Sequence, residues 1–564
     1  MALAHFRIDP SKPVLIAFSA FLCALIFLPL SWLVYFSVTD NAGALTPNNF
    51  IQLVSDPTLL QPLLTTVQLA LGVGLICSLV APPLAWLVAR TDMPLRGWVR
   101  VLVTASLVTP PFLGAIAWEI LAAPNSGILN QWYRALFDLD PYASLLNIYT
   151  RFGLVFAISC YTFPYVFVLV ANALDRIPAD LEDASAVLGG GAWYTARRVT
   201  IPLVLPAILA GTLVALLQAM TLFGSPAILA LPAGFHTMTT KIWSLFQYPP
   251  KPGLAAAASL PLLLITVVLL RTQHRLLRRR GYSIVGGKHG APRLLHLGGW
   301  KWPAILLCLL VLGSSVLLPY AALIKTAVVK QPGEPLSWAN LTLHHIDFVF
   351  FEFSATKLAL YNTFVLGVLT ATLGTALALV IAYLTARQLV WGHRVLGFLA
   401  TAPIAIPGIV MGVAIFLSYT RPPLVLYGTL WILLLAFLTI ELPAGYQQLQ
   451  SAFRAIHPEL EEASRILGAN RLQSLWHITA PLLRSGVIAT WCFIFIGVIR
   501  ELSAAILLFT ADTKVVSTII YDLNESGDLG AISVLGLTML VVTFAVVILA
   551  NRLPVLGASA PGRS

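Results

Sequence analysis

The sequence predicts an all-α polytopic membrane protein with about 12 transmembrane helices in two parallel six-span repeats. Three observations carry this prediction. First, 58% of the 564 residues are hydrophobic and only 10% are charged, and the mean hydropathy is +0.87. Second, apolar runs of bilayer length recur along the whole chain. Third, similar segments return in the second half at a constant spacing. A soluble fold could not cover this much apolar surface.

Twelve apolar runs are long enough for a helix to cross a bilayer. The first follows Arg7 and Lys12 as a signal peptide would, but the stretch 13–38 is too long for one and lacks a small-x-small cleavage site. We therefore expect it to be retained as a span. The predicted spans are 13–37, 60–89, 99–121, 153–175, 203–230, 254–270, 303–324, 358–386, 395–419, 426–450, 482–509 and 530–550.

The basic residues indicate the orientation of these spans. If the N-terminus is cytoplasmic, the basic connections fall on the inner side and most unpaired acids, such as Asp138 and Asp528, fall on the outer side. Both termini are then expected in the cytoplasm. The formal net charge of +11 reflects this pattern, and no nucleic-acid partner is expected. Outside the central linker, the inner basic residues are Arg90, Arg96, Arg100, Arg176, Arg197, Arg198, Arg387, Arg394, Arg454, Arg465 and Arg471.

Matching residues recur in the two halves at constant spacings. Gly189 and Gly468 are 279 residues apart, while earlier in each half Arg90 and Arg387 are 297 residues apart. The difference of 18 residues is extra length in the outer loop around 119–152 of the first half. The sequence thus indicates an internal duplication.

The duplication divides the chain into three predicted parts. A first half of six spans covers 1–270, and a second half of six spans covers 302–564. Between them, 271–301 is a basic linker without a single acid, which we expect in the cytoplasm.

Two polar loops, 176–202 and 454–481, interrupt the apolar pattern. Each opens with a short predicted helix whose first turn carries acids, which complement the helix dipole. A glycine ends that helix, and a proline suits the first turn of the next span. We predict a helix-turn-helix lying across the membrane surface. Because the loop occurs twice at the same place in the topology, a docking surface for a pair of soluble partners explains it better than an interfacial connector.

The spacing within both loops resembles the EAA motif of binding-protein-dependent ABC importer permeases, E-A-A-x3-G-x9-I-x-L-P. An aspartate replaces the first glutamate in the first loop, serine replaces the second alanine in both, and alanine replaces leucine in the second. The resemblance assigns ATPase coupling to Glu182, Asp183, Ala184, Gly189 and Pro202 in the first loop and to Glu461, Glu462, Ala463, Gly468 and Pro481 in the second.

The resemblance implies a type I ABC importer permease fold over essentially the whole chain. Each polar loop would be a coupling loop seated in one of two cytoplasmic ABC ATPase subunits. An external or periplasmic binding protein would deliver the substrate, and the chain would lie in the bacterial inner membrane in contact with lipid. ATP hydrolysis would belong to the partners, because the stretch 281–289 fails as a phosphate-binding P-loop in both register and context. No cofactor is implied.

The substrate expectation rests on narrower resemblances. The fused layout, with RELSAAILL at 500–508 and FHTMTTKIWSLFQYPP at 235–250, is most similar to the ferric iron group of these permeases. A phosphonate, a polyamine or a thiamine-like substrate would suit related permeases. The alternative from another class is a major-facilitator-like secondary transporter, which shares the six-plus-six layout. The loop ARTDMPLRGWVR between spans two and three lacks the G-x-x-x-D-R-x-G-R run typical of that class.

Among the ionisable residues inside predicted spans we single out Glu441, Arg500 and Glu501. Each would cost roughly 2.5 to 3.5 kcal/mol against lipid, so each is expected to face the bundle interior or a cavity. One hypothesis places them along the translocation path. The alternative is a structural ion pair between Glu441 and Arg500.

No other chemistry is expected of the chain. The five cysteines lie within predicted spans and form no C-x-x-C pair. Two adjacent histidines, His344 and His345, precede Asp347 without a further ligand at helical spacing, so we predict no metal site. There is no nucleophile elbow, H-E-x-x-H motif or pair of catalytic carboxylates, so we do not expect an enzyme.

Overall fold

The computed structural model describes residues 11–40, 43–279, 294–390 and 392–557, so most of the predicted linker, 280–293, lies outside the described residues. Over these ranges the regular elements are helices, and β-type pairing is limited to isolated bridges. Ten helices are long and apolar enough to cross a membrane, and two bent helix pairs raise the number to twelve. The predicted all-α polytopic fold with about 12 spans is confirmed.

The first half contains five long helices and one bent pair. They are α1 (Ser11–Ser37), α3 (Pro57–Arg90), the pair α4 (Arg96–Val108) and α5 (Pro111–Ala122), α7 (Arg151–Asp175), α10 (Ile201–Thr221) and α13 (Pro252–Arg279). Shorter helices on its loops are α2 (Asn48–Ser55), α6 (Ile128–Phe137), α8 (Ala179–Val187), α9 (Ala192–Thr195), α11 (Gly224–Leu229) and α12 (Met238–Ser244).

The second half repeats this order. Its long elements are the run α14 (Lys301–Leu312) to α15 (Leu318–Val328), α17 (Ser354–Ala386), the bent pair α18 (His393–Thr401) and α19 (Gly408–Tyr419), α20 (Leu430–Ala455), α23 (Ala480–Arg500) and α26 (Leu529–Gly557). Its shorter helices are α16 (His344–Asp347), α21 (Glu459–Ile466), α22 (Arg471–Ser474), α24 (Ala505–Leu508) and α25 (Val516–Ser526).

Two predicted spans, 99–121 and 395–419, are not straight helices. The chain turns by 101° between α4 and α5 and by 105° between α18 and α19. The turns occur at Pro110 and Pro407, where the ring disfavours helical backbone in the residue before it. Thr109 and Ile406 accordingly have extended ψ angles of 130° and 115°. The same proline therefore bends the third span of each half.

The predicted spans 203–230 and 482–509 are too long at their C-terminal ends. α10 stops at Thr221 and α23 at Arg500, and in both cases an extended residue follows before the chain turns into a short helix, α11 or α24. After α10, Gly224 and Pro226 favour this break. After α23, the side chain of Glu501 accepts the backbone N–H of Ala504, 2.9 Å away, and so holds the turn.

The first span of each half packs on the other half. α1 contacts α18 and α19 of the second half, while α15 contacts α5 of the first half. Side chains also join the first span of the second half to the first half. The Trp118 indole donates to the Ser314 carbonyl at 3.1 Å, and the Thr109 and Tyr320 hydroxyls lie 2.6 Å apart. Neither half is therefore a self-contained unit.

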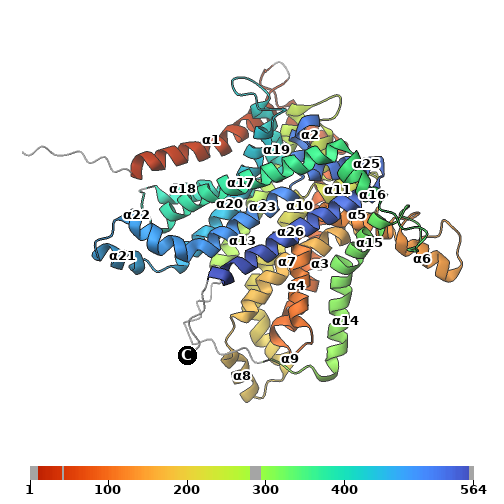
Figure 1. Ribbon diagram of the computed structural model, residues 1–564, viewed down its shortest axis with the longest axis horizontal. Helices are drawn as coiled ribbons and strands as arrows, with labels where there is room; N and C mark the ends of the chain where they lie inside the picture. Colours follow the sequence, from red (N-terminus) through yellow and green to blue (C-terminus); the bar gives the residue numbers. More distant parts are fainter. Residues whose placement is uncertain (1–10, 41–42, 280–293, 391, 558–564) are drawn as a thin grey trace, which may run out of the picture.

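The halves meet at one end of the molecule and diverge at the other. Figure 1 shows first-half helices such as α3 and α7 running toward α8 and α9, while α17 and α20 run toward α21 and α22 at a separate corner. Contacts between the halves include Asn524 with Glu119 at 3.1 Å and the rings of Phe246 and Phe416 at 5.2 Å. The two polar loops thus lie at separate places beyond the region where the halves join.

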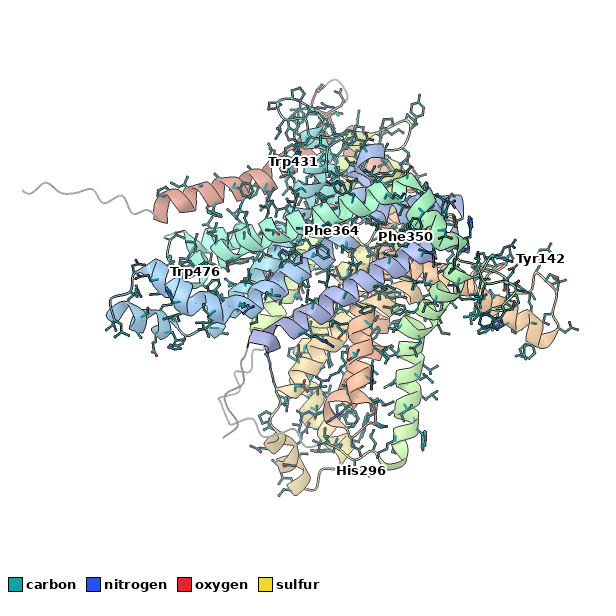
Figure 2. The ribbon with its side chains drawn as sticks, in the orientation of Figure 1. Tyr142, His296, Phe350, Phe364, Trp431 and Trp476 are labelled. Atoms are coloured by element: carbon teal, nitrogen blue, oxygen red, sulfur yellow. The ribbon has the colours of Figure 1, made fainter. Side chains whose placement is uncertain are left out.

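The extra length of the outer loop in the first half folds as α6. The buried Asn130 side chain fastens it by donating to the carbonyls of Ala123 and Leu146. This segment projects from the bundle, with Tyr142 at its tip, on the side opposite Trp476 of the second polar loop (Figure 2).

Candidate functional site

The two polar loops have the same order of elements. α8 is followed by α9, a π-helical turn at Ala196–Thr200 and α10, and α21 is followed by α22, a π-helical turn at Leu475–Thr479 and α23. The first helix of each loop carries the predicted acids in its first turns. The duplication read from the sequence thus extends to backbone geometry.

A glycine ends the first helix of each loop, as predicted. Gly189 has φ +85° and Gly468 has φ +92°, the left-handed conformation that side chains with a Cβ disfavour. The next amide then reaches back five residues, from Gly190 to the Ser185 carbonyl at 2.9 Å and from Ala469 to the Ser464 carbonyl at 3.1 Å. This pattern satisfies carbonyls that the helix end would leave unpaired.

The second helix of each loop differs from the predicted helix-turn-helix across the membrane surface. It continues directly into the next span, so that Trp193–Thr221 and Leu475–Arg500 are each one continuous helix. Pro202 and Pro481 lie inside these continuous helices, where a missing N–H is accommodated only if the hydrogen bonds shift. The π-helical turn makes this shift, since the Ile201 amide donates to the Ala196 carbonyl five residues back.

In the first loop, one acid of α8 turns inward. The Glu182 carboxylate accepts the Thr200 hydroxyl at 3.0 Å and lies 3.5 Å from the Arg90 guanidinium. Arg90 ends α3 and is only 1% exposed. It also donates to the carbonyls of Leu174 and Ile177, at 2.7 and 2.8 Å, at the end of α7. One side chain thus joins α3, α7 and α8.

The second loop repeats this arrangement. The Glu461 carboxylate accepts the Thr479 hydroxyl at 2.9 Å and pairs with Arg387, whose Nε and Nη2 lie 3.0 and 2.9 Å away. Arg387 follows α17 and donates to the Ile456 carbonyl at 3.1 Å, at the end of α20. The Nε–H donates a charge-assisted hydrogen bond to this carboxylate, and Nη2 adds an ion-pair contact to the same oxygen.

A second hydroxyl contact braces each loop internally. Ser185 of α8 and Thr195 of α9 lie 2.7 Å apart, and Ser464 of α21 and Ser474 of α22 lie 3.0 Å apart. Serine replaces the second alanine of the EAA motif at both positions. The departure from the motif therefore has a structural role, because it ties the two helices of each loop together.

The opposite face of each loop is exposed and apolar at its tip. Leu188 is 88% exposed and Leu467 is 89% exposed, and each follows another exposed apolar residue, Val187 or Ile466. Trp476 is 73% exposed and projects from the second loop (Figure 2). Such side chains on an otherwise polar segment mark an interaction surface.

The remaining predicted coupling residues lie on or near this outer face. Ala184, Glu462 and Ala463 are exposed, whereas Asp183 is half-buried. The first of the two adjacent acids in each helix, Glu182 or Glu461, faces the protein, and in the second loop the exposed Glu462 is available to a partner. The sequence predicted the acidic pair but not this division.

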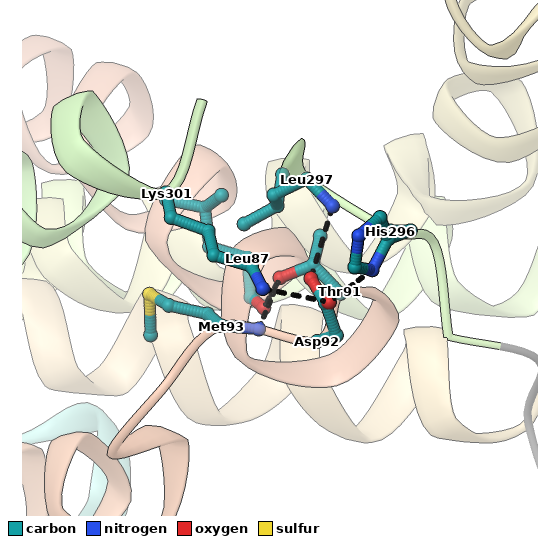
Figure 3. Close-up of polar contacts among 7 residues, drawn as sticks. All are labelled: Leu87, Thr91, Asp92, Met93, His296, Leu297 and Lys301. Carbon is teal, nitrogen blue, oxygen red and sulfur yellow. Dashed lines mark hydrogen bonds and ion pairs between the residues drawn. The ribbon is translucent and has the colours of Figure 1, made fainter. Parts of the chain in front are cut away.

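The end of the linker is fastened beside the first loop (Figure 3). The Asp92 amide donates to the Leu295 carbonyl at 3.0 Å, and the Leu295 amide donates to the Arg90 carbonyl at 2.8 Å. The Asp92 carboxylate accepts the Leu297 amide at 2.9 Å and pairs with Lys301 and His296. The Leu297 amide holds the pKa of Asp92 below its ordinary value of 3.8, and the two cations add to this effect. We call these contacts the linker clasp.

The three predicted membrane charges are half-buried, Glu441 in the middle of α20 and Arg500 and Glu501 at the end of α23. The Glu441 carboxylate packs against Gly497, where an added Cβ would lie 2.4 Å from its Cδ. Glu501 lies against Gly408, the first residue of α19. The ion pairs found among the described residues do not include one between Glu441 and Arg500.

Comparison with known proteins places the chain in a family. The sequence profile described as binding-protein-dependent transport system inner membrane component matches residues 81–282 and again 374–554. The chain belongs to this family. Each matched region contains one polar loop. Each region also begins after the first span of its half, the span that packs on the other half. The chain is thus a transport permease with two copies of the family's domain, and the major-facilitator alternative is wrong.

Several permeases resemble this one. Ferric transport system permease protein FbpB of Actinobacillus pleuropneumoniae is 23% identical over 523 residues, covering 91% of this chain and 74% of the relative. Putative ferric transport system permease protein FbpB 1 of Haemophilus influenzae is 23% identical over 526 residues, covering 91% and 81%. Molybdenum transport system permease protein ModB of Mycobacterium tuberculosis is 27% identical over 224 residues, covering 39% and 81%.

Sequence reasoning missed four residues of the permease's loops. Arg90 and Arg387 were interpreted only as inner charges and as markers of the repeat, and no role was predicted for Thr200 and Thr479. A signal was present, because both arginines repeat at the 297-residue spacing and both threonines at the 279-residue spacing. Without the fold, nothing connects a span end to a loop about 90 residues away.

Proposed function

We propose that this permease carries ferric iron from an external or periplasmic binding protein into the cytoplasm, driven by two cytoplasmic ABC ATPase subunits that dock on its two polar loops. The observation that carries the proposal is the duplicated loop itself. Each copy holds one acid inward and presents an apolar tip outward, at the same place in each half. We call the two segments coupling loops from here on.

The surface of the coupling loops supports docking of a protein. Leu188 and Leu467 are almost fully exposed at the tips, and acids and arginines surround them. An apolar anchor within a polar rim is typical of protein interfaces. Two equivalent loops suit two ATPase subunits, one for each half.

Iron as the substrate is supported by the relatives that align with both halves. Two ferric transport permeases cover 91% of this chain, whereas the molybdenum permease aligns with 39% of it. The fused arrangement is thus shared with the ferric proteins over nearly the whole length.

Alternating access is supported by the way the halves are joined. They contact each other toward the outer loops and diverge toward the coupling loops (Figure 1). ATP-driven approach of the two ATPase subunits would bring the coupling loops together. The halves would then rock about their contacts and open to the binding protein.

An inner-membrane location with cytoplasmic coupling loops and termini is supported by the linker clasp. Asp92 brings the end of the linker to the same side as the first coupling loop. The linker is basic, and the positive-inside rule places such a segment in the cytoplasm.

Binding-protein-stimulated ATP hydrolysis tests the proposal. The permease is reconstituted in vesicles with its ATPase subunits, and hydrolysis is compared with iron-loaded and with empty binding protein. We expect stimulation only by the iron-loaded form. Stimulation by neither form in an assembled complex contradicts iron, and failure of the ATPase subunits to bind contradicts the coupling role of the loops.

A further inference from the structure

The strongest unassigned feature is the set of contacts made by Arg90 and Arg387. Each arginine ends or follows the second span of its half, and each holds a coupling-helix glutamate together with carbonyls at the end of the fourth span. The same glutamate holds a threonine just before the fifth span. We call each set of contacts an arginine anchor.

We propose that Arg90 and Arg387 are positioning residues that transmit the displacement of each coupling helix to three membrane helices of its own half. The inference rests on the proposed function, since it assumes that ATPase subunits move the coupling loops. Through the anchor, a push on α8 reaches α3, α7 and α10 together. A push on α21 reaches α17, α20 and α23 in the same way.

The covalent connections of the coupling helices are less suited to this task. α8 joins the next span through a left-handed turn at Gly189 and a π-helical turn, and α21 does so through Gly468. Both turns have backbone geometries that bend easily compared with a regular helix. Without the anchor, a displaced coupling helix would flex at these turns instead of moving the spans.

The chemistry of the anchors also favours a rigid link. Arg90 is 1% exposed, and a buried guanidinium that loses its partner is strongly unfavourable. Arg387 is bound through Nε, Nη1 and Nη2 to two different elements, which fixes the plane of its fork. A coupling helix held in this way cannot slide along the spans without separating its glutamate from both the threonine hydroxyl and the arginine guanidinium.

Distances between equivalent positions of the two halves test the inference without reference to the substrate. Spin labels are placed at Asp180 and Glu459, on the two coupling helices, or at Phe152 and Trp431, exposed at the outer ends of α7 and α20. Each doubly labelled permease is assembled with its ATPase subunits in lipid nanodiscs. Both distances are measured with and without ATP and vanadate.

In the otherwise unaltered permease, ATP should shift both distances. With Glu461→Gln, the distance between coupling helices should still shift, but the shift at the outer ends should be reduced, because the second half no longer follows its coupling helix. Loss of one charge-assisted hydrogen bond should change the equilibrium constant between the two positions of the outer ends, with and without ATP, by about tenfold or more. Thr479→Val, which removes one hydroxyl of the same anchor, should give a smaller loss and serves if Glu461→Gln fails to assemble.

The matched control is Arg454→Met. Arg454 is the first residue of the second coupling loop, lies in the last turn of α20 and is exposed, so this change removes a positive charge from the loop without touching the anchor or the exposed tip. Both distance shifts should be retained. If Arg454→Met reduces the outer shift as Glu461→Gln does, the effect is one of net charge and the anchor is not responsible.

The outcomes separate this inference from the proposed function. An outer shift of unchanged size in both Glu461→Gln and Thr479→Val overturns the anchor's role. Loss of both shifts in proportion to the amount of folded complex also overturns it, because the anchor is then only structural. If the unaltered complex shows no shift between the coupling helices, the proposed function fails first.

Discussion

The left-handed glycine of the first coupling loop gives a quantitative prediction, tested by Gly189→Ala. Gly189 has φ +85°, and a Cβ added there would meet no atom within 4 Å. The penalty is therefore conformational rather than steric, about 1 to 2 kcal/mol for a residue with a side chain in this region. The affinity of the ATPase subunits for the permease should fall about five- to thirtyfold, since 1.4 kcal/mol corresponds to a factor of ten.

The same loop offers the control. Gly191, two residues on, also has open space at its Cβ position, but its φ lies outside the left-handed region. Gly191→Ala should therefore change the affinity less than twofold, within the range of about 0.5 kcal/mol usual for surface substitutions. Gly189→Asn should retain more affinity than Gly189→Ala, because asparagine tolerates left-handed backbone better. The affinities are measured by surface binding of purified ATPase subunits to permease in nanodiscs. Equal effects of Gly189→Ala and Gly191→Ala would refute the conformational reasoning.

Three further predictions follow from other parts of the molecule. Asp92→Ala should speed hydrogen exchange of the Leu297 amide, because the carboxylate that accepts this amide is lost. In the unaltered permease, protection of the Leu297 amide, corrected for intrinsic exchange, should stay constant from about pH 5 to 8. It should fall only as the pH drops through the lowered pKa of Asp92, below 3.8. Leu467→Asp should weaken ATPase binding about tenfold or more in a pull-down titration while leaving the thermal stability of the free permease unchanged, because the side chain is exposed. Glu501→Gln or Arg500→Met should slow iron uptake by vesicles; unchanged uptake in both, at equal amounts of folded protein, would remove them from the translocation path.

The sequence predicted what depends on local pattern. Bilayer-length apolar runs located the spans, and the glycine of each polar loop located the end of its first helix. Gly189 and Gly468 have the predicted left-handed conformation. These features depend on a residue and its near neighbours, so they can be read without the fold.

Contacts between distant segments could not be predicted in this way. Spans three and nine were taken as straight, although Pro110 and Pro407 were visible, because a proline can kink a helix or end it and only packing decides which. The inward turn of Glu182 and Glu461 depends on arginines about 90 and 75 residues earlier in the chain. The packing of α1 and α15 on the opposite half could not be predicted, because these helices are apolar on every side and their sequences do not show which face meets which partner.

The packing of α1 on the second half has a consequence for biosynthesis. α1 ends at Ser37 and packs both on α13 of its own half, which begins at Pro252, and on α19 of the second half, which begins at Gly408, about 370 residues after α1. At translation rates of about 5 to 20 residues per second, α19 follows α1 by roughly 20 to 75 seconds. Exposed apolar side chains such as Phe21 and Phe27 along α1 suit that interval in lipid. A nascent chain arrested before residue 393 would hold an inserted first helix without its second-half partners.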